Sequence, residues 1–120
     1  AAPPPPKYPA GDRSHIPDSL KPTYEFLSQE LARLRQTTPP NQKRLVDDTD
    51  RRVNLLFDAL NCETLSKNTS EILFALIRAM SERNRDAALM IHADMLKAAT
   101  TSNEDIMTWA MGVKQLCIRL

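Results

Sequence analysis

The sequence predicts an all-α protein, a five-helix bundle with short connections that follows an irregular, proline-rich leader. Apolar residues recur in alternating steps of three and four, which is the spacing of a helix that buries one face. The 120-residue chain contains only two glycines, and its prolines gather near the start. These observations divide the chain into a leader, residues 1–17, and an α-helical bundle domain, residues 18–120.

The leader holds six of the nine prolines in the chain. The run from Pro3 to Pro6 lacks amide donors and has fixed φ angles, which predicts a disordered or extended polyproline II segment. Residues 8–16 are expected to be irregular and polar, so removing residues 1–15 should cost the bundle little stability. Because the chain begins with a proline run and without methionine, we expect a fragment in which a linker leads into a terminal domain.

The first helix is expected over residues 22–36, where Pro22 is acceptable in the first turn. Pro39 and Pro40 open the second helix, which extends to about residue 60. The predicted inner face of this second helix comprises Leu45, Val46, Val53, Leu56, Phe57 and Leu60. Connections of about two to five residues predict that neighbouring helices run roughly antiparallel.

Ser66 and Asn84 are expected to cap the third and fourth helices, residues 67–82 and 85–99. The fifth helix carries an apolar stripe that includes Trp109, which we expect in the core. Two residue pairs before this helix have capping-box spacing: Thr101 with Glu104, and Ser102 with Asp105. A glycine inside this helix, Gly112, is expected to admit the close approach of another helix, such as the fourth.

Composition narrows the possible classes of protein. Hydrophobic residues make up 42% of the chain, enough for a bundle of about 100 residues to bury a core. Sixteen basic residues against fifteen acidic ones argue against a dedicated duplex-binding module, which needs clustered cations. Cys62 and Cys117 are interpreted as buried thiols in a reducing compartment. No stretch approaches the ~20 apolar residues of a membrane span, and a cytoplasmic protein is expected.

No constellation of residues predicts catalysis, a metal site or a bound cofactor. No Cys, Asp or His stands at a helical spacing that would complete a metal site with His92. A Gly-rich phosphate loop and a nucleophile elbow are both missing from the sequence. We interpret His92 as a packed or hydrogen-bonded structural residue, and the chain as a non-enzymatic protein.

The densest charged cluster lies in the second helix. Asp47 and Arg51 are four residues apart, as are Asp48 and Arg52, which is the spacing of surface ion pairs. This cluster is either a solvated face or a patch that docks a partner. The proline run is likewise either a stiff spacer or a preformed polyproline II ligand. The candidate partner-binding residues are Pro3, Pro4, Pro5, Pro6, Lys43, Arg44, Asp47, Arg51 and Arg52.

Two stretches of the last two helices resemble the steroid receptor RNA activator protein family, a family of five-helix bundles. The matching residues are Asp86-Ala87-Ala88 with Ile91-His92, and Trp109 with Gly112-Val113-Lys114 and Leu116. A related bundle ends the larger outer-shell subunit of the coat protein complex II (COPII) vesicle coat. The leader from Tyr8 to Pro17 is similar to the segment that precedes this bundle in fungal coat subunits.

The resemblance to the coat subunit covers nearly the whole chain and implies the C-terminal domain of a coat scaffold. The implied partners are other coat subunits, with the inner layer contacted through the proline run and the outer layer through the bundle. In that family, the proline-rich region promotes GTP hydrolysis by the coat GTPase. The implied location is the cytosolic face of ER exit sites and COPII vesicles, with membrane association only through the coat.

Two other functions compete with a coat module. The first is a nuclear receptor coregulator of the steroid receptor RNA activator type, but an RNA-binding surface should concentrate Lys and Arg, whereas here they alternate with Asp and Glu. No specific nucleic-acid binding is therefore expected. The second is an enzyme fragment, which the missing catalytic constellation argues against.

Overall fold

A computed structural model describes residues 7–120, and this part of the chain forms a bundle of five α-helices. The predicted all-α class is confirmed, while the proline run Pro3 to Pro6 lies outside the described residues. The boundary between leader and bundle after residue 17 stays a prediction. The helical elements are η1 (Asp18–Leu20), α1 (Lys21–Thr37), η2 (Pro40–Gln42), α2 (Lys43–Cys62), α3 (Lys67–Ser81), α4 (Arg85–Thr101) and α5 (Met107–Ile118).

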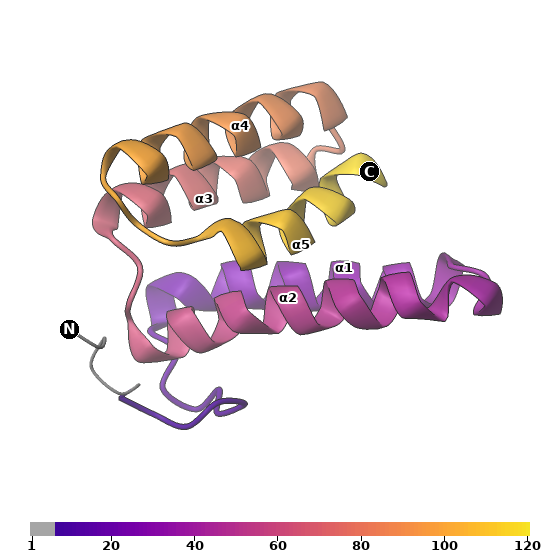
Figure 1. The fold of residues 1–120 in the computed structure, drawn as a ribbon, viewed down its shortest axis with the longest axis horizontal. Coiled ribbons are helices and arrows are strands. Elements are labelled where there is room, and N and C mark those ends of the chain that lie inside the picture. The colour runs from indigo at the N-terminus through magenta and orange to yellow at the C-terminus, as the bar shows by residue number, and fades with distance from the viewer. Residues whose placement is uncertain (1–6) are drawn as a thin grey trace.

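Two helical hairpins and a final helix make up the bundle (Figure 1). α1 and α2 form one hairpin, α3 and α4 form the other, and α5 packs mainly against α2 and then against α4. The turn between α1 and α2 projects beyond the other helices, whereas the connection from α2 to α3 lies at the opposite end (Figure 1). The described part of the molecule is elongated along this hairpin, with extents of 42 × 28 × 28 Å.

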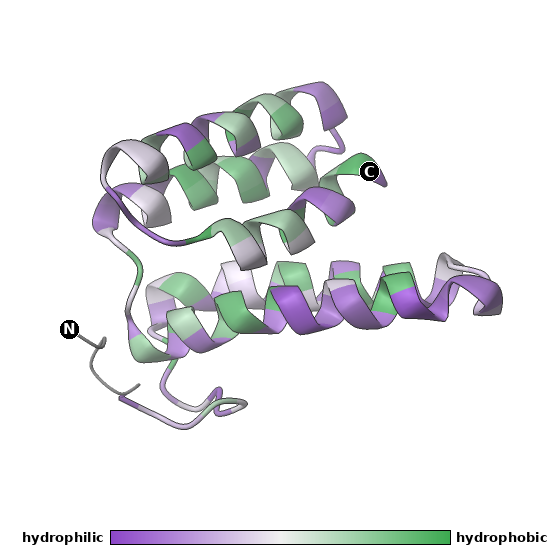
Figure 2. Cartoon of the chain, viewed as in Figure 1, coloured by the Kyte–Doolittle hydropathy of each residue, from purple (hydrophilic) through white to green (hydrophobic). Residues whose placement is uncertain are grey.

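The core is built from the apolar stripes that the helical periodicity predicts (Figure 2). On α2, Leu45 is only half-buried, and the other members of the predicted inner face are all buried: Val46, Val53, Leu56, Phe57 and Leu60. The Tyr24 ring of α1 meets the Phe57 ring edge to face, with centroids 4.8 Å apart. Trp109 is 5% exposed, which confirms its predicted place in the core.

Local hydrogen bonds set the beginnings of α3 and α4. The Ser66 hydroxyl accepts from the Thr69 amide at 3.1 Å, and the Asn84 side-chain oxygen accepts from the Ala87 amide at 3.1 Å. Both predicted N-caps are confirmed, because each satisfies an amide that has no partner inside its helix.

Neither predicted capping box forms before α5. Ser102 instead ends α4, and the N-cap position of α5 is Ile106, which makes no side-chain cap. The Glu104 carboxylate reaches the start of α3, where it accepts from the Ser66 amide at 3.0 Å and from the Thr69 hydroxyl at 2.5 Å. Burial by itself would raise the pKa of Glu104, but the hydrogen bonds from Thr69 and Ser66 together lower it below its usual value. The capping-box prediction failed because the Glu104 carboxylate is stabilised at the N-terminus of α3 instead of at the start of α5.

Gly112 allows α5 to approach α2 closely. A Cβ atom at this position would lie 2.7 Å from Arg52 Cβ and 3.1 Å from Val53 Cγ2. The expected close approach is therefore present, but the partner is α2 and not α4. The absent side chain lets the core residues of α5 reach the inner face of α2.

The leader packs on the C-terminal half of α2. Asp58 accepts from the Gly11 amide at 3.0 Å and pairs with the Arg13 guanidinium at 2.6 Å. Asn61, itself fully buried, accepts from the His15 amide at 2.7 Å. These contacts, next to the buried side chain of Ile16, weigh against the expectation that residues 1–15 contribute little to stability, which stays a prediction.

Asp12 organises this part of the leader. Its carboxylate accepts from the Ser14 hydroxyl at 2.8 Å and from the Asn61 amide group at 3.1 Å, and it lies 2.8 Å from His15 Nδ1. Hydrogen bonds from Ser14, then Asn61 and His15, hold the pKa of Asp12 far below its usual range. The irregular segment is thus a folded loop that hydrogen bonds and an ion pair hold against α2.

Candidate protein-interaction surfaces

The predicted charged residues of the bundle lie together on the first half of α2. We refer to Lys43, Arg44, Asp47, Arg51 and Arg52 as the charged face. All of these side chains are exposed except that of Arg52, which is half-buried beside Gly112. The structure therefore brings the predicted bundle residues onto one solvent-facing part of one helix.

The ion pairs on the charged face differ in part from the predicted ones. Asp48 accepts from Arg52 at 2.9 Å, which confirms that pair, and also from Arg51 at 2.8 Å. These bonds, with that from Arg51 the larger effect, lower the pKa of Asp48. The predicted pair between Asp47 and Arg51 is wrong, because Asp47 faces α1 and lies 3.4 Å from Arg35. The spacing of residues along one helix does not reveal a competing cation on a neighbouring helix.

The projecting end of the α1–α2 hairpin carries the cations of the charged face that are unpaired in the described part of the chain. A shallow hollow of about 260 Å³ there is lined by Arg35, Thr38, Pro39, Pro40, Lys43 and Val46. Among the residues that the structure describes, Lys43 and Arg44 take part in no ion pair. This end of the molecule consequently presents two cations that are free to meet an acidic partner surface.

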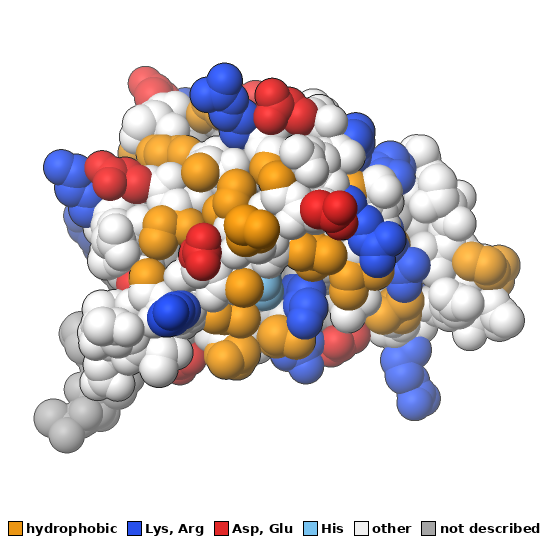
Figure 3. Space-filling view, turned by 90° about the horizontal axis from the view of Figure 1, so that it is seen from above, with side chains coloured by type: hydrophobic (Ala, Val, Ile, Leu, Met, Phe, Trp, Pro, Cys, Tyr) orange, Lys and Arg blue, Asp and Glu red, His pale blue; other side chains and the backbone are white. Residues whose placement is uncertain are grey.

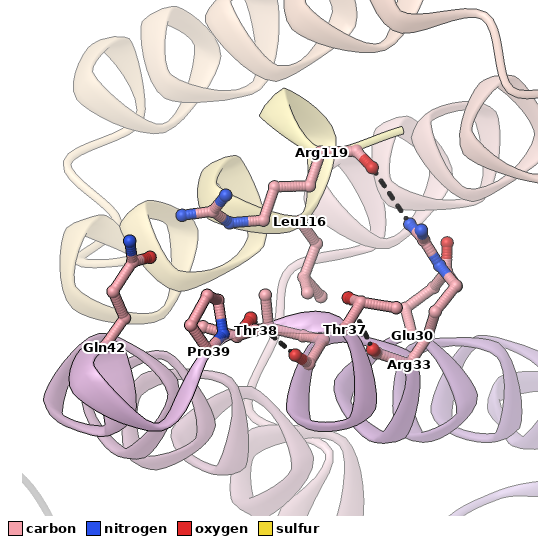
Figure 4. A pocket seen from close by; sticks show the side chains of 9 residues that line it. Glu30, Arg33, Thr37, Thr38, Pro39, Gln42, Leu116 and Arg119 are labelled. Carbon is pink, nitrogen blue, oxygen red and sulfur yellow. Dashed lines mark hydrogen bonds and ion pairs between the residues drawn. The ribbon is translucent and has the colours of Figure 1, made fainter.

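A small hollow of about 140 Å³ beneath this end has a structural role (Figure 4). Glu30, only 3% exposed, pairs there with Arg83 from the α3–α4 turn and with Arg33, 3.1 Å away. Arg33 also donates to the Arg119 carbonyl at 3.1 Å, as Figure 4 shows. Glu30 thus joins α1 to the α3–α4 turn, and Arg33 joins α1 to the end of the chain after α5.

His92 is buried between α4 and α5, with 2% of its surface exposed. Its Nε2 lies 2.6 Å from the Ala110 carbonyl oxygen, which can only accept, so Nε2 carries the hydrogen. Burial lowers the pKa of His92, although the hydrogen bond partly opposes this. The predicted structural role is confirmed, because the ring is buried and hydrogen-bonded.

Both cysteines are free thiols. Cys117 is buried, and burial raises its pKa to about 12, whereas Cys62 is half-buried and lies 3.6 Å from the Tyr8 carbonyl. Within residues 7–120, no group of three or more His, Cys, Asp or Glu side chains is placed to hold a metal ion. No helix in the same range combines the length and apolarity needed to cross a membrane.

The face that includes α4 differs from both ends of the hairpin. Seen from above, it mixes exposed apolar side chains with charges of both signs (Figure 3). Met90 of α4 is the most exposed of the large apolar residues in the described part, at 68%. Apolar side chains gather across the middle of this face with charges around them (Figure 3), and nothing in the described part of this face identifies a ligand for it.

A second candidate surface, at the α2–α3 end, was not anticipated from the sequence. Two adjoining hollows of about 450 Å³ and 400 Å³ share Ala59 and Leu65 as lining residues. Leu55 and Phe74, which are 40% and 41% exposed, line the first and the second hollow respectively. Their only sequence signal is that both are large apolar residues outside the inward stripes of their helices.

Comparison with known proteins relates nearly the whole chain to fungal transport proteins. It is 47% identical over 114 residues to the protein transport protein SEC31 of Mycosarcoma maydis, covering 95% of this chain and 8% of the relative. The corresponding values for Schizosaccharomyces pombe are 42% over 109 residues, 91% of this chain and 9% of the relative. This chain is homologous to one segment of the SEC31 proteins.

Other SEC31 proteins support the same relationship. The match to that of Emericella nidulans is 44% over 117 residues, which cover 97% of this chain and 9% of the relative. No family model matches the chain, and no solved structure matches it. The resemblance to the fungal outer-shell coat subunit is confirmed, and the coregulator alternative receives no support from the SEC31 relatives.

Proposed function

We propose that this chain is a non-enzymatic protein–protein interaction module of a vesicle-coat scaffold, which supports assembly of the COPII outer coat in transport from the ER to the Golgi. The observation that carries the proposal is its 42–47% identity to SEC31 transport proteins over 91–97% of its length. A well-packed bundle with its one bundle histidine buried agrees with binding as the activity. No cofactor is needed for this role.

Two separate elements of the chain bind different coat subunits. The proline run Pro3 to Pro6 contacts the inner coat layer, and the charged face of α2 contacts the outer layer. The charged face lies on the first half of α2, whereas the described leader is held by Asp58 and Asn61 near the other end of this helix. Two linked weak contacts raise the effective concentration of each.

The module acts in the cytoplasm, on the cytosolic face of ER exit sites and COPII vesicles. Its association with the membrane is peripheral and indirect, through the other coat subunits. Within residues 7–120, Lys43 and Arg44 are the unpaired cations of the charged face, fewer than the clusters of about 4–8 Lys or Arg that bind anionic lipid. The coat contacts therefore have to provide the membrane recruitment.

The test measures binding of purified inner-layer and outer-layer coat subunits in separate assays. Replacing Pro3 to Pro6 by an Ala-Gly-Ser sequence should abolish inner-layer binding alone. The variant Arg51→Glu/Arg52→Glu should abolish outer-layer binding alone, while Arg85→Glu/Lys97→Glu on the exposed part of α4 serves as the charge-matched control. The proposal fails if neither layer binds the wild-type chain, and the two-element arrangement fails if either variant loses both contacts.

A further inference from the structure

The two hollows at the α2–α3 end adjoin each other and together make a surface groove with a partly apolar lining. We call it the Leu65 groove, because Leu65 and Ala59 line both of its halves. Leu55 contributes to one half and Phe74 to the other. The groove therefore joins the outer side of α2, the α2–α3 connection and the outer side of α3.

Leu55 and Phe74 are large apolar side chains that remain partly exposed on the same groove. Leu55 and Phe74 each keep about two-fifths of their surface in water, at 40% and 41%. Burying such side chains in a partner is favourable in proportion to the apolar area removed from water. The floor of the groove thus supplies a driving force for binding, although it does not identify the ligand.

The rim of the groove supplies the missing specificity, because its charges are almost all negative. A single cation, Lys67, lines the groove. The carboxylates that line it are Asp58, Glu63, Glu71, Glu104 and Asp105. Since the chain as a whole has a net charge of +1, this concentration of acid is local to the groove.

Most of the rim carboxylates have no cation beside them. Asp58 pairs with Arg13, and within residues 7–120 it is the only one of the five rim carboxylates in an ion pair. Glu104 is held by neutral donors of Ser66 and Thr69. Uncompensated carboxylates next to an apolar floor favour cationic ligands and repel phosphate groups.

We propose that the Leu65 groove binds a short apolar segment of another protein that is flanked by Lys or Arg side chains. The apolar residues of this segment cover Leu55, Leu65 and Phe74, while its cations meet Glu63, Glu71 and Asp105. The acidic rim disfavours anionic lipid and nucleic acid as ligands. The inference rests on the proposed function only in treating the bundle as an interaction module, since the groove is distinct from the charged face.

The test begins with selection of twelve-residue peptides from a random display library on the intact chain. The variant Leu55→Ser/Phe74→Ser serves for counter-selection, because both side chains are exposed and the helices should still form. The selected peptides should combine apolar residues with flanking Lys or Arg. Titration of a synthetic copy into the isotope-labelled chain should shift the backbone NMR resonances of Leu65 and its neighbours in the groove.

Matched variants then separate the apolar and charged contributions to affinity. Leu55→Ser/Phe74→Ser should raise the Kd of the selected peptide at least about tenfold. Glu71→Lys/Asp105→Lys should raise it several-fold and reduce its dependence on salt concentration. The control variants Met90→Ser and Asp94→Lys, both on exposed positions of α4, should leave the Kd unchanged.

Three outcomes would overturn the inference. The selected peptides could lack basic residues or shift resonances outside the groove. The chain could self-associate through the groove, in which case Phe74→Ser would abolish a dimer seen by sedimentation. Deletion of residues 1–6 could shift the groove resonances, which would make the proline run of the same chain its occupant. None of these outcomes affects the coat-binding assays with the charged-face variant, so the proposed function succeeds or fails separately.

Discussion

The two ends of α2 differ both in what surrounds them and in what they present to solvent. At the N-terminal end, Lys43 and Arg44 project beside a proline turn, and exposed ion pairs cover the helix. At the C-terminal end, the leader packs across the helix, and an acid-rimmed apolar groove opens beside it. With 20 residues, α2 is about 30 Å long. One helix can therefore hold two binding surfaces of opposite charge far enough apart to act independently.

The difference also shows that net charge is a poor guide to the surface of this chain. The overall value of +1 excludes a strongly basic protein. It does not reveal that the N-terminal half of α2 with its charged face, which we call the tip, is cationic and that the Leu65 groove is acidic. Each surface would attract a different class of partner, and each association would weaken as salt increases. Stability is distributed unevenly as well, since the leader end adds buried contacts and the tip adds exposed ones.

The largest expected effect comes from the core that both ends share. Trp109→Ala should lower the free energy of unfolding by about 3–5 kcal/mol, because a nearly buried ring would leave a cavity. Chemical denaturation of the variant against the wild type measures this directly. If stability is unchanged while peptide binding at the groove is lost, Trp109 belongs to the acidic surface and not to the core.

The second effect concerns the leader and should be confined to the acidic end. Removing residues 1–16 should cost about 2 kcal/mol, from lost burial of Ile16 and lost hydrogen bonds to Asn61. Removing only residues 1–6 should leave the free energy of unfolding unchanged, because those contacts remain. Equal stability of the two truncated chains would restore the expectation that the whole leader is dispensable.

The third effect is a pH dependence that arises in the core, at His92 between α4 and α5. Its pKa in the folded chain lies below the ordinary value of 6.5, so protonation favours the unfolded chain. Stability should be complete above about pH 6.5 and should fall as the pH decreases below that value. Between pH 7.5 and 5.5, the free energy of unfolding of the wild type should fall by more than that of His92→Gln, measured by urea denaturation at both pH values. Parallel losses in the two proteins would assign the acid sensitivity to other groups.

The helices and their caps could be predicted because both depend on residues that are close in sequence. Ser66 and Asn84 meet amides three residues away, and the buried stripe of α2 follows from its own spacing. The leader could not be placed in this way, since Arg13 finds Asp58 only after the bundle has formed. Glu104 likewise has a local partner by spacing but a better one across the molecule.

The same reasoning explains what could be predicted of the interaction surfaces. The charged face could be predicted because its residues lie on consecutive turns of one helix. The Leu65 groove could not, because residues from α2, α3 and the connections assemble it. Single exposed apolar residues such as Leu55 and Phe74 are common on soluble proteins, and only their shared groove and acidic rim distinguish them.

The smallest effect compares the same substitution at the two ends of α2. Asp48 lies at the tip with Arg51 and Arg52, where its side chain is 45% exposed. Asp58 lies under the leader, where it is 26% exposed and its partner Arg13 is 18% exposed, and it also accepts from the Gly11 amide. Exposed pairs contribute little because water and salt screen them, whereas a partly buried carboxylate loses more when its charge is removed.

Asp58→Asn should therefore lower the free energy of unfolding by up to about 1 kcal/mol, and Asp48→Asn should lower it by less. The helix dipole would favour the opposite order, because Asp48 is nearer the N-terminus of α2, but its effect fades beyond the first turn. Urea denaturation of the two variants in low and high salt provides the measurement. An equal or larger loss for Asp48→Asn would mean that the tip is held by its ion pairs as firmly as the other end is held by the leader. The contrast between the two ends would then lie only in the partners they attract.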